Sequence, residues 1–339
     1  MPTTKHTKLV LDSFIERLGD REVMPFDEYV DFALYDSTMG YYTTPKARVG
    51  RSSQSDFITS TSFGILWGEL IVDACKNILG SENLMKYTFV EIAAEPEQSV
   101  LSEIDHPFGE TKIIRLGDPQ DIPSPAIVYS NEWLDAQVFK RFCFNPENKS
   151  WREMGVALEK GLFREKPVNT SLSSKPPIDF PEEYSTPYQI DWPSGSIQAL
   201  ELLCSKKWFG LFLTFDYGLP KEILFRERPE GTARSYYRHQ MRYNLLSKIG
   251  EQDITCHLCW DELVRVLEHS KFNHPQLVTQ ESFLMNHASE KIKEVLSIST
   301  GKPTPQTQIL KELLHPLRMG NKFKALWGIR VDERKILTE

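Results

Sequence analysis

The sequence has no long uncharged apolar run and few cysteines. None of its 339 residues falls in a window of about 18 apolar residues, the length that a membrane-spanning helix needs. The opening residues also lack the apolar core of a signal peptide. Its five cysteines are an odd number scattered along the chain, which favours reduced thiols over disulfides. We therefore expect a cytoplasmic protein without a membrane span.

The sequence also lacks an excess of positive charge. It has 40 Lys and Arg against 47 Asp and Glu, so its net charge is -7. This balance argues against a protein that binds nucleic acid by neutralising phosphates. Hydrophobic residues at 40% and charged residues at 26% are ordinary globular values, which exclude disordered, collagen-like and coiled-coil chains. The length suits one large domain or two modest ones.

Short β-branched and aromatic runs alternate with segments of helical periodicity. The expected strands are 87–92, 112–116, 126–130, 209–215 and 324–330, and the expected early helices are 8–18, 24–34 and 64–79. This alternation predicts an α/β protein with a parallel sheet. Composition suggests three parts: an N-terminal helical cap with a Tyr/Gly-rich loop at 1–80, an α/β core at 81–143 and 197–339, and an insertion at 144–196.

Polar side chains follow two of the expected strands. The run 209–215 leads into Asp216 and Tyr217, and the run 126–130 leads into Asn131 and Glu132, with Asp135 close behind. Open α/β sheets bind ligands at the carboxyl ends of their strands. Carboxylates there could hold ribose hydroxyls or a guanidinium group. The alternative is an acidic helix N-terminus that complements the helix dipole.

The turn after the expected strand 87–92 contains no glycine. Nucleotide-binding folds place glycines at this turn so that the backbone can approach the ligand. Here Ala93 is followed by Glu95 and Pro96, which add bulk and charge and remove one N–H donor. The local sequence therefore argues against a phosphate or dinucleotide site and favours an ordinary turn from strand to helix.

Two further groups of residues have a functional and a structural interpretation. Arginine, tyrosine and histidine cluster between 231 and 239, where they could contact an anionic or peptide partner or form a solvated basic face. Cys256 and Cys259 form a single CxxC pair without a second pair at zinc spacing. We expect them to be buried thiols, and we predict no metal site.

Several short strings, taken in order, resemble one known family. They are Phe26-Asp27-Glu28-Tyr29, Gly40-Tyr41-Tyr42, Asp56-Phe57-Ile58-Thr59, Asn131-Glu132, Leu134-Asp135-Ala136, Phe215-Asp216-Tyr217-Gly218, Gly231-Thr232, Arg238-His239 and Gly250-Glu251-Gln252-Asp253-Ile254-Thr255. Over nearly the whole chain, their order and spacing resemble the MidA-type methyltransferases that depend on S-adenosylmethionine (SAM). The resemblance implies a class I, Rossmann-like methyltransferase sheet with an N-terminal helical cap and an inserted substrate region.

The resemblance also implies an activity and a set of site residues. The mitochondrial member of the family is a protein arginine methyltransferase that assists assembly of respiratory complex I, so methyl transfer to a protein arginine is implied. The implied cofactor-binding residues are Glu91, Ala93, Asp118, Asn131, Asp216, Tyr217, Asp56 and Thr59. Glu132 and Asp135 are the expected catalytic residues, because carboxylates can hold a guanidinium in line with the donor methyl. A protein substrate or partner is expected. The sequence does not decide between a monomer and a homodimer.

The sequence departs from the family where the cofactor would bind. Ala93 and Glu95 occupy the first two glycine positions and Glu97 the third. Side chains there take up space near the adenosine, and Glu95 would repel the methionine carboxylate. The stretch 91–132 is also short for the family, so we expect that the helix after the first strand, or the second strand with its ribose-binding acid, is trimmed. Asp118 is the only acid near that position. The alternative hypothesis is a catalytically inactive methyltransferase-like protein that acts as a binding or assembly factor.

Overall fold

The computed structural model describes residues 5–44, 63–94, 99–169, 176, 180–181, 183–298 and 303–332. The chain divides into two compact units. Unit 1 comprises 1–57, 135–198 and 219–259, and unit 2 comprises 58–134, 199–218 and 260–339. The three-part division expected from composition, with its boundaries at 80, 143 and 196, stays a prediction.

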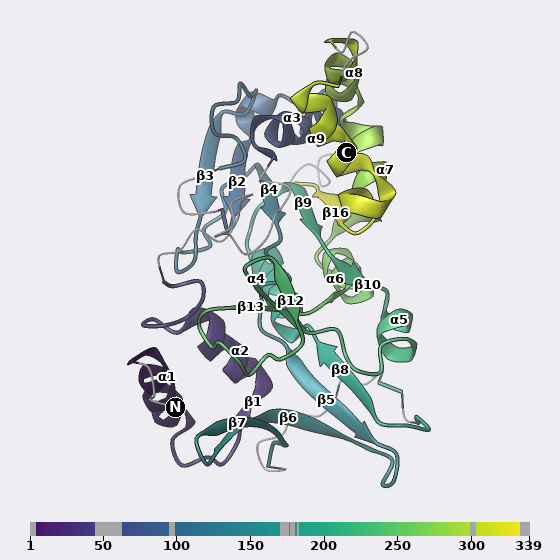
Figure 1. Cartoon of the computed structure of the whole chain (residues 1–339). Coiled ribbons are helices and arrows are strands. Elements are labelled where there is room, and N and C mark those ends of the chain that lie inside the picture. The colour runs from purple at the N-terminus through teal and green to yellow at the C-terminus, as the bar shows by residue number, and fades with distance from the viewer. Residues whose placement is uncertain are drawn as a thin grey trace. The chain divides into compact units, whose positions relative to one another are not determined.

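Unit 2 is built on a six-stranded mixed sheet with the order β15-β16-β9-β4-β2-β3 (Figure 1). Its strands are β2 (Thr88–Ile92), β3 (Glu110–Ile114), β4 (Ala126–Asn131), β9 (Gly210–Asp216), β15 (Phe272–Thr279) and β16 (Lys324–Arg330). Strands β3, β2, β4 and β9 are parallel, whereas β16 and β15 are antiparallel to their neighbours. The α/β class and the parallel strands expected from the sequence are confirmed.

The central strands are continuous apolar runs because both of their faces are covered. Every residue of β9 is buried, as is every residue of β2. Phe215 on β9 contacts Trp67 edge to face, with ring centroids 4.9 Å apart. Trp67 belongs to α3 (Ile65–Leu79), which shares one hydrophobic core with α7 (Gln280–His287), α8 (Ser289–Ile298) and α9 (Pro305–Leu314). Unit 2 also contains α6 (Trp260–His269).

The order of the strands reverses beside β2. From β2 the chain passes to β3 on one side and then to β4 on the other. Ile92, the last residue of β2, lies opposite Ile114 of β3 and Ser130 of β4. Doubly wound sheets bind ligands at such a switch point, outside the carboxyl ends of the strands. The residues that follow these strands are therefore the first place to look for a site.

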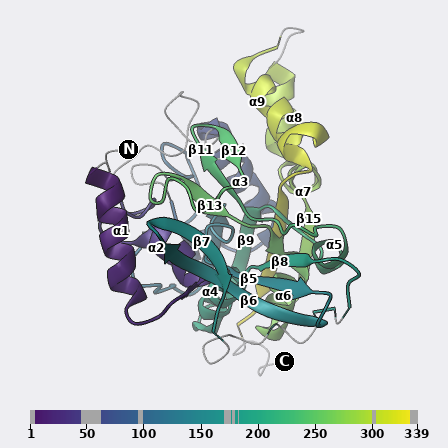
Figure 2. The ribbon, with the colours of Figure 1, turned by 60° about the horizontal axis from the view of Figure 1, so that its bottom comes forward.

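Unit 1 contains a five-stranded antiparallel sheet and a smaller three-stranded one (Figure 2). The first consists of β1 (Met24–Pro25), β5 (Lys140–Asn145), β6 (Ser150–Glu159), β7 (Leu162–Pro167) and β8 (Tyr188–Trp192). The second consists of β11 (Arg234–Tyr237), β12 (Gln240–Arg242) and β13 (Asp253–Thr255). Unit 1 also contains α1 (Lys5–Leu18), α2 (Phe26–Tyr35), α5 (Lys221–Arg226) and β14 (Leu258–Cys259). Two elements begin in one unit and end in the other: α4 (Ser194–Ser205), most of which belongs to unit 2, and β10 (Gly218–Leu219).

A buried ion-pair network ties the elements of unit 1 together. The Arg141 guanidinium donates hydrogen bonds to Asp191 and Glu165 at 2.7 Å each. Asp191 also accepts the backbone N–H groups of Thr232 and Ala233 at 2.8 Å each. Gly231 is required beside it, because a Cβ there would lie 2.2 Å from Asp191 Oδ2. The network therefore fixes the backbone that leads into β11.

No helix among the described residues is both long enough and apolar enough to cross a bilayer.

Arg330 caps the C-terminal end of α4. Its Nε, Nη1 and Nη2 atoms donate to the carbonyls of Trp208, Cys204 and Lys206 at 2.7, 2.7 and 2.8 Å. The guanidinium also lies 4.6 Å from the centroid of the Trp208 ring. The planar fork of arginine thus binds one carbonyl in the last turn of α4 and two in the segment that follows it.

We predict that Arg330→Ala lowers the free energy of unfolding by about 2 to 4 kcal/mol, because it leaves partly buried carbonyls without a donor. Arg330→Lys should rescue less than half of this loss, since an ammonium cannot reach three divergent carbonyls. The measurement is chemical denaturation. Lys293→Ala is the control, because its ion pair with Glu290 is exposed (70% and 75%), and its effect should stay within about 0.5 kcal/mol. Equal effects of Arg330→Ala and Lys293→Ala would contradict this assignment.

His257 makes the stability of the fold sensitive to acid. Burial lowers the pKa of His257 to about 3, and the charges of Arg234 and Arg228 act in the same direction. Between that value and about 6.5 the unfolded chain binds a proton that the folded chain does not. The stabilisation is thus fully present above pH 6.5 and is lost as the pH falls toward 3, by about 1.4 kcal/mol per pH unit at most. His257→Gln should flatten this slope, and the exposed His269→Gln should not. Parallel pH profiles for wild type and His257→Gln in denaturant titrations would contradict this.

Candidate functional site

Most of the residues expected to form the site lie at four adjacent strand ends in unit 2. In sheet order, Asp118 follows β3, Glu91 and Ala93 mark the end of β2, Asn131 and Glu132 mark the end of β4, and Asp216 with Tyr217 marks the end of β9. Ala93 donates its N–H to the carbonyl of Ile114 at 2.8 Å, which extends the β2–β3 pairing one residue further. Glu132 donates its N–H to the carbonyl of Phe215 at 2.8 Å, which does the same for β4 and β9. The structure therefore brings these positions together.

The Glu91 side chain binds the backbone of the segment that begins at residue 99, after the turn that follows β2. Its carboxylate accepts the backbone N–H of Val100 at 2.9 Å, and the residue is only 4% exposed. Burial raises the pKa of the Glu91 carboxyl, while hydrogen bonds from Ser99 and Val100 and the charge of Arg115 act in the opposite direction. Sequence reasoning did not single out Arg115. Its charge interacts with Glu91, but nothing in the local sequence signals that pairing.

Two strand ends have a left-handed backbone conformation without glycine. Ala93 has a φ of 60° and Glu132 has a φ of 50°. This region costs an L-residue roughly 1 to 2 kcal/mol relative to glycine. Ala93 thus has the backbone conformation that glycine favours, at the position where the resemblance places the first glycine. The change from glycine to alanine adds a methyl group but does not remove the turn.

Asn131 presents a buried acceptor at the end of β4. Its Nδ2 donates to Glu132 Oε1 at 3.1 Å. Its Oδ1 is buried and accepts no hydrogen bond from the described residues. A buried carbonyl oxygen without a donor costs about 1 to 3 kcal/mol, so a ligand donor at this position would be favourable. Asn131 follows Ser130, which lies opposite Ile92, so this acceptor lies at the switch point.

Asp216 has a structural task at the end of β9. Its Oδ2 accepts the N–H of Leu134 at 3.1 Å and its Oδ1 accepts the N–H of Tyr217 at 2.8 Å. The residue is completely buried. Both carboxylate oxygens therefore help to close the backbone around the strand end. Tyr217 packs edge to face on Phe323, with centroids 5.8 Å apart.

The shortened stretch after β2 keeps its second strand. β3 is present, and the described residues between β2 and β3 form turns without a helix. Asp118 lies on the exposed turn after β3, where its Oδ2 accepts the Arg115 N–H at 2.8 Å. An acid therefore follows this strand, as the resemblance implies, and no helix is present among the described residues between β2 and β3.

Asp135 belongs to unit 1 and is buried there. Thr255 Oγ1 donates to the Asp135 carboxylate at 3.1 Å. Nearby, the Tyr42 hydroxyl donates to Asp253 Oδ1 at 3.0 Å, and Tyr42 stacks on Tyr35 with centroids 5.4 Å apart. The charges of Asp253 and Asp135 both contribute to the raised pKa of Tyr35, after the larger effect of burial. Unit 1 thus gathers two carboxylates and two aromatic rings.

Two stretches discussed from the sequence, Asp56–Thr59 and Glu95–Glu97, lie outside the described residues.

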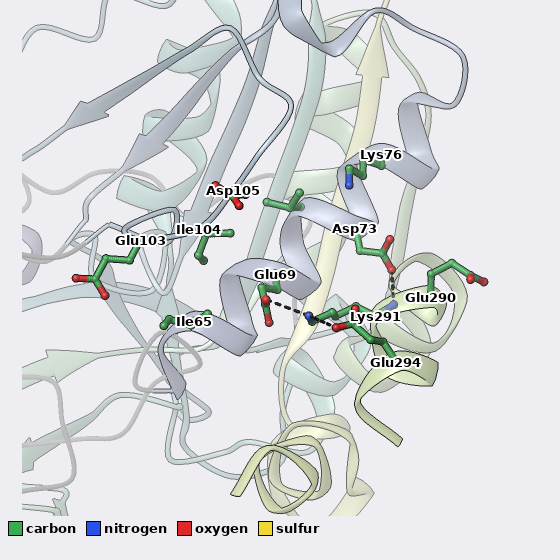
Figure 3. Close-up of a pocket in the computed structure, with 11 residues that line it drawn as sticks. Ile65, Glu69, Asp73, Lys76, Glu103, Ile104, Asp105, Glu290, Lys291 and Glu294 are labelled. Carbon is green, nitrogen blue, oxygen red and sulfur yellow. Dashed lines mark hydrogen bonds and ion pairs between the residues drawn. The ribbon is translucent and has the colours of Figure 1, made fainter. Parts of the chain in front are cut away.

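The hollow drawn in Figure 3 lies elsewhere in unit 2. It has a volume of about 560 Å³ and is lined by α3, α8 and residues 103–105, which lie between β2 and β3. Six carboxylates and two lysines line it, and Lys291 pairs with Glu69 and Glu294 at 3.0 Å each. None of the strand-end residues belongs to this lining. The hollow is therefore separate from the candidate site.

The CxxC pair shows no sign of chemistry. Cys256 and Cys259 are buried, and burial raises the pKa of the Cys256 thiol well above its ordinary value. Within the part of the chain that the structure describes, no three His, Cys, Asp or Glu side chains converge as metal ligands would.

The fold and the strand ends define a doubly wound α/β protein whose strand order reverses at β2 and β4, the position where such sheets bind ligands. Residues 70–278 match the family described as "Putative S-adenosyl-L-methionine-dependent methyltransferase". The match covers more than half of the chain, and the protein belongs to this family.

Two solved structures share the fold over nearly the full length. One is described as a "likely methyl transferase from Burkholderia thailandensis bound to S-adenosyl-homocysteine", with a TM-score of 0.81 and 20% identity, covering 96% of this chain and 92% of that one. The other is a native crystal structure of a protein of the same superfamily from the same organism, with a TM-score of 0.76, 19% identity and the same coverage. No curated protein matches the chain. These likenesses confirm the Rossmann-like fold.

We predict that Ala93→Gly raises the free energy of unfolding by about 0.5 to 1 kcal/mol, because glycine adopts a φ of 60° without the steric cost to alanine. Ala94→Gly is the matched control, since Ala94 has no positive φ and glycine there adds only backbone entropy. Ala94→Gly should therefore lower the free energy of unfolding by about 0.5 to 1 kcal/mol. Urea denaturation measures both. A loss of stability in Ala93→Gly equal to that in Ala94→Gly would contradict the assigned strain.

Proposed function

We propose that this protein is an active SAM-dependent methyltransferase whose cofactor binds at the ends of β2, β3 and β4. The observation that carries the proposal is the buried Asn131 Oδ1, an acceptor without a described donor at the switch point of the sheet. Membership of the methyltransferase family supports it. The solved relative with S-adenosyl-homocysteine adds support from a protein of the same fold.

The residues at the strand ends fit this cofactor. Asn131 Oδ1 can accept a hydrogen bond from an amino group, and the Asp118 carboxylate can accept bonds from ribose hydroxyls. The carboxylates of Glu132 and Asp118 provide a negative field that suits a sulfonium cation. The exposed Ala93 adds only a methyl group to a turn that keeps a left-handed φ of 60°. The first departure from the glycine pattern is therefore compatible with binding.

We further propose that the methyl acceptor is a protein arginine, as the MidA resemblance implies. Bound SAM supplies an electrophilic methyl group on its sulfonium. Glu132 accepts hydrogen bonds from the guanidinium and turns one nitrogen toward that methyl, and Asp135, three residues further on, is the second proposed carboxylate. Glu132 is half-buried at the strand end, and Asn131 Nδ2 holds its carboxylate at 3.1 Å. A carboxylate would accept the proton that the nitrogen loses when its bond to the methyl carbon forms and the bond from that carbon to sulfur breaks, which would leave S-adenosylhomocysteine.

Cofactor binding is tested by calorimetric titration with SAM and S-adenosylhomocysteine. Wild type should bind both, and Asn131→Leu should bind them about tenfold or more weakly, because it removes the acceptor while keeping the side-chain volume. Asn273→Leu, on the exposed face of β15 in the same sheet, is the matched control and should bind as wild type does. Absence of heat with both ligands at millimolar concentration would contradict the proposal. The alternative hypothesis, an inactive methyltransferase-like protein that acts as a binding or assembly factor, would then be favoured.

The acceptor is tested with tritiated SAM and a protein extract from cells that lack the gene. After acid hydrolysis we expect the label in methylarginine. Glu132→Gln should reduce the labelling about a hundredfold, since it removes a charged acceptor. Its affinity for S-adenosylhomocysteine should stay within about twofold of wild type, because this ligand lacks the sulfonium charge and the other proposed role of Glu132 concerns the acceptor. Label in methyllysine or in a non-protein fraction would contradict arginine specificity without affecting the cofactor proposal.

A further inference from the structure

Arg115 carries the one positive charge at the described strand ends of unit 2. The residues that end or follow the four parallel strands are 115–118 at β3, 93–94 at β2, 131–134 at β4 and 216–218 at β9. The other charged side chains among them are the carboxylates of Asp118, Glu132 and Asp216. A lone cation in this setting either pairs with one of these carboxylates or remains for an anionic group of a ligand.

The guanidinium of Arg115 forms no ion pair with a described residue, and its buried Nε makes no hydrogen bond there. Burial raises the pKa of Glu91 and the charge of Arg115 acts against this rise, so the two side chains lie near each other. The Glu91 carboxylate nevertheless accepts the Val100 N–H at 2.9 Å and not a guanidinium N–H. Asp118 accepts the backbone N–H of Arg115 and not its side chain. Because a buried donor without an acceptor is unfavourable, an anionic group of a ligand would be stabilising here.

Arg115 and Asn131 flank Ala93 at the switch point of the sheet. β2 lies between β3 and β4, and one residue beyond their register the three strands continue with Ala93, Arg115 and Asn131. Alternation along the strands directs the side chains of Arg115 and Asn131 to the face that carries Glu91. Their backbones are two strand spacings apart, about 10 Å. The exposed Ala93 between them adds only a methyl group, so a ligand group that lies over Ala93 can contact both side chains.

The amino-acid end of SAM matches this pair of side chains. It carries an ammonium group and a carboxylate on the same carbon, and the carboxylate is the one anionic group of the cofactor. The unsatisfied Oδ1 of Asn131 can accept a hydrogen bond from the ammonium group. The guanidinium of Arg115 can donate two parallel hydrogen bonds to the carboxylate. The adenine and the ribose carry no negative charge that would satisfy Arg115.

We propose that Arg115 binds the methionine carboxylate of the cofactor and so determines the preference for SAM over its decarboxylated form. This inference rests on the proposed function, because it requires the methyl donor to bind at the ends of β2, β3 and β4. A cation at this position also offsets the repulsion between Glu95 and the carboxylate that the sequence predicts. The carboxylate does not change during methyl transfer, so Arg115 acts on binding and selectivity rather than on the chemical step.

The test is calorimetric titration with two ligands that differ in one group. S-adenosylhomocysteine carries the carboxylate, and its decarboxylated analogue keeps the amino group, the sulfur and the adenosine. Wild type should bind S-adenosylhomocysteine about tenfold or more tightly than the analogue, because the analogue cannot form the charge-assisted pair with Arg115. This comparison needs no substitution, so it does not depend on whether a variant folds.

Variants assign the preference to Arg115. Arg115→Gln should bind S-adenosylhomocysteine about tenfold or more weakly than wild type does, and should bind the analogue within about twofold of wild type. Arg115→Lys should recover part of the preference, since an ammonium group keeps the charge but not the fork. Asn131→Leu should weaken both ligands by the same factor, because both keep the amino group. Arg164→Gln, which alters an exposed arginine on β7 of unit 1, is the control and should bind both ligands as wild type does.

Circular dichroism and the melting temperature check that each variant is folded. Equal affinity of wild type for the two ligands would overturn the inference, as would a preference that Arg115→Gln retains. An equal loss of affinity for both ligands in Arg115→Gln would also overturn it, because it would assign Arg115 a structural role. In these cases the cofactor still binds to wild type and the proposed function stands. If wild type binds neither ligand, the proposed function fails and the inference fails with it.

Discussion

The candidate site depends on the pairing of β2 with β3 on one side and with β4 on the other. This register places Ile92 opposite both Ile114 and Ser130, so the next residues of the three strands meet at one edge of the sheet. Burial of both faces maintains the register, because a slip of one residue would exchange the side chains on the two faces. The polar groups at the strand ends are therefore positioned by an apolar core that none of them belongs to.

The sequence predicts the strands well, and it predicts which polar residues share one edge of the sheet, for a physical reason. Continuous apolar runs such as 209–215 require a sheet covered on both faces, and the polar residues that follow them must lie at its carboxyl edge. The roles of single residues are harder to predict. Asp216 resembles a ligand-binding acid in sequence, yet its two oxygens accept N–H groups of Leu134 and Tyr217. Which N–H groups meet a carboxylate depends on the tertiary fold.

Ala93 shows a different limit of sequence reasoning. Alanine in place of glycine argues against a turn that approaches a ligand closely, because local preference disfavours a positive φ. In the structure the surrounding strands impose that φ, and the N–H of Ala93 still bonds to Ile114. Tertiary hydrogen bonding thus overrides a local cost of roughly 1 to 2 kcal/mol. Asp135 is a further case, since Thr255, its partner in unit 1, lies 120 residues away in the chain.

The central claim is that the ends of β2, β3 and β4 bind the methyl donor, and hydrogen exchange with mass spectrometry tests it most directly. With saturating S-adenosylhomocysteine, the account predicts slower exchange in peptides that cover 88–94, 110–118 and 126–132. Peptides that cover 65–76 and 290–294, which line the acidic hollow between α3 and α8, should exchange as before. Protection confined to the hollow, or no protection at any strand end, would contradict the account.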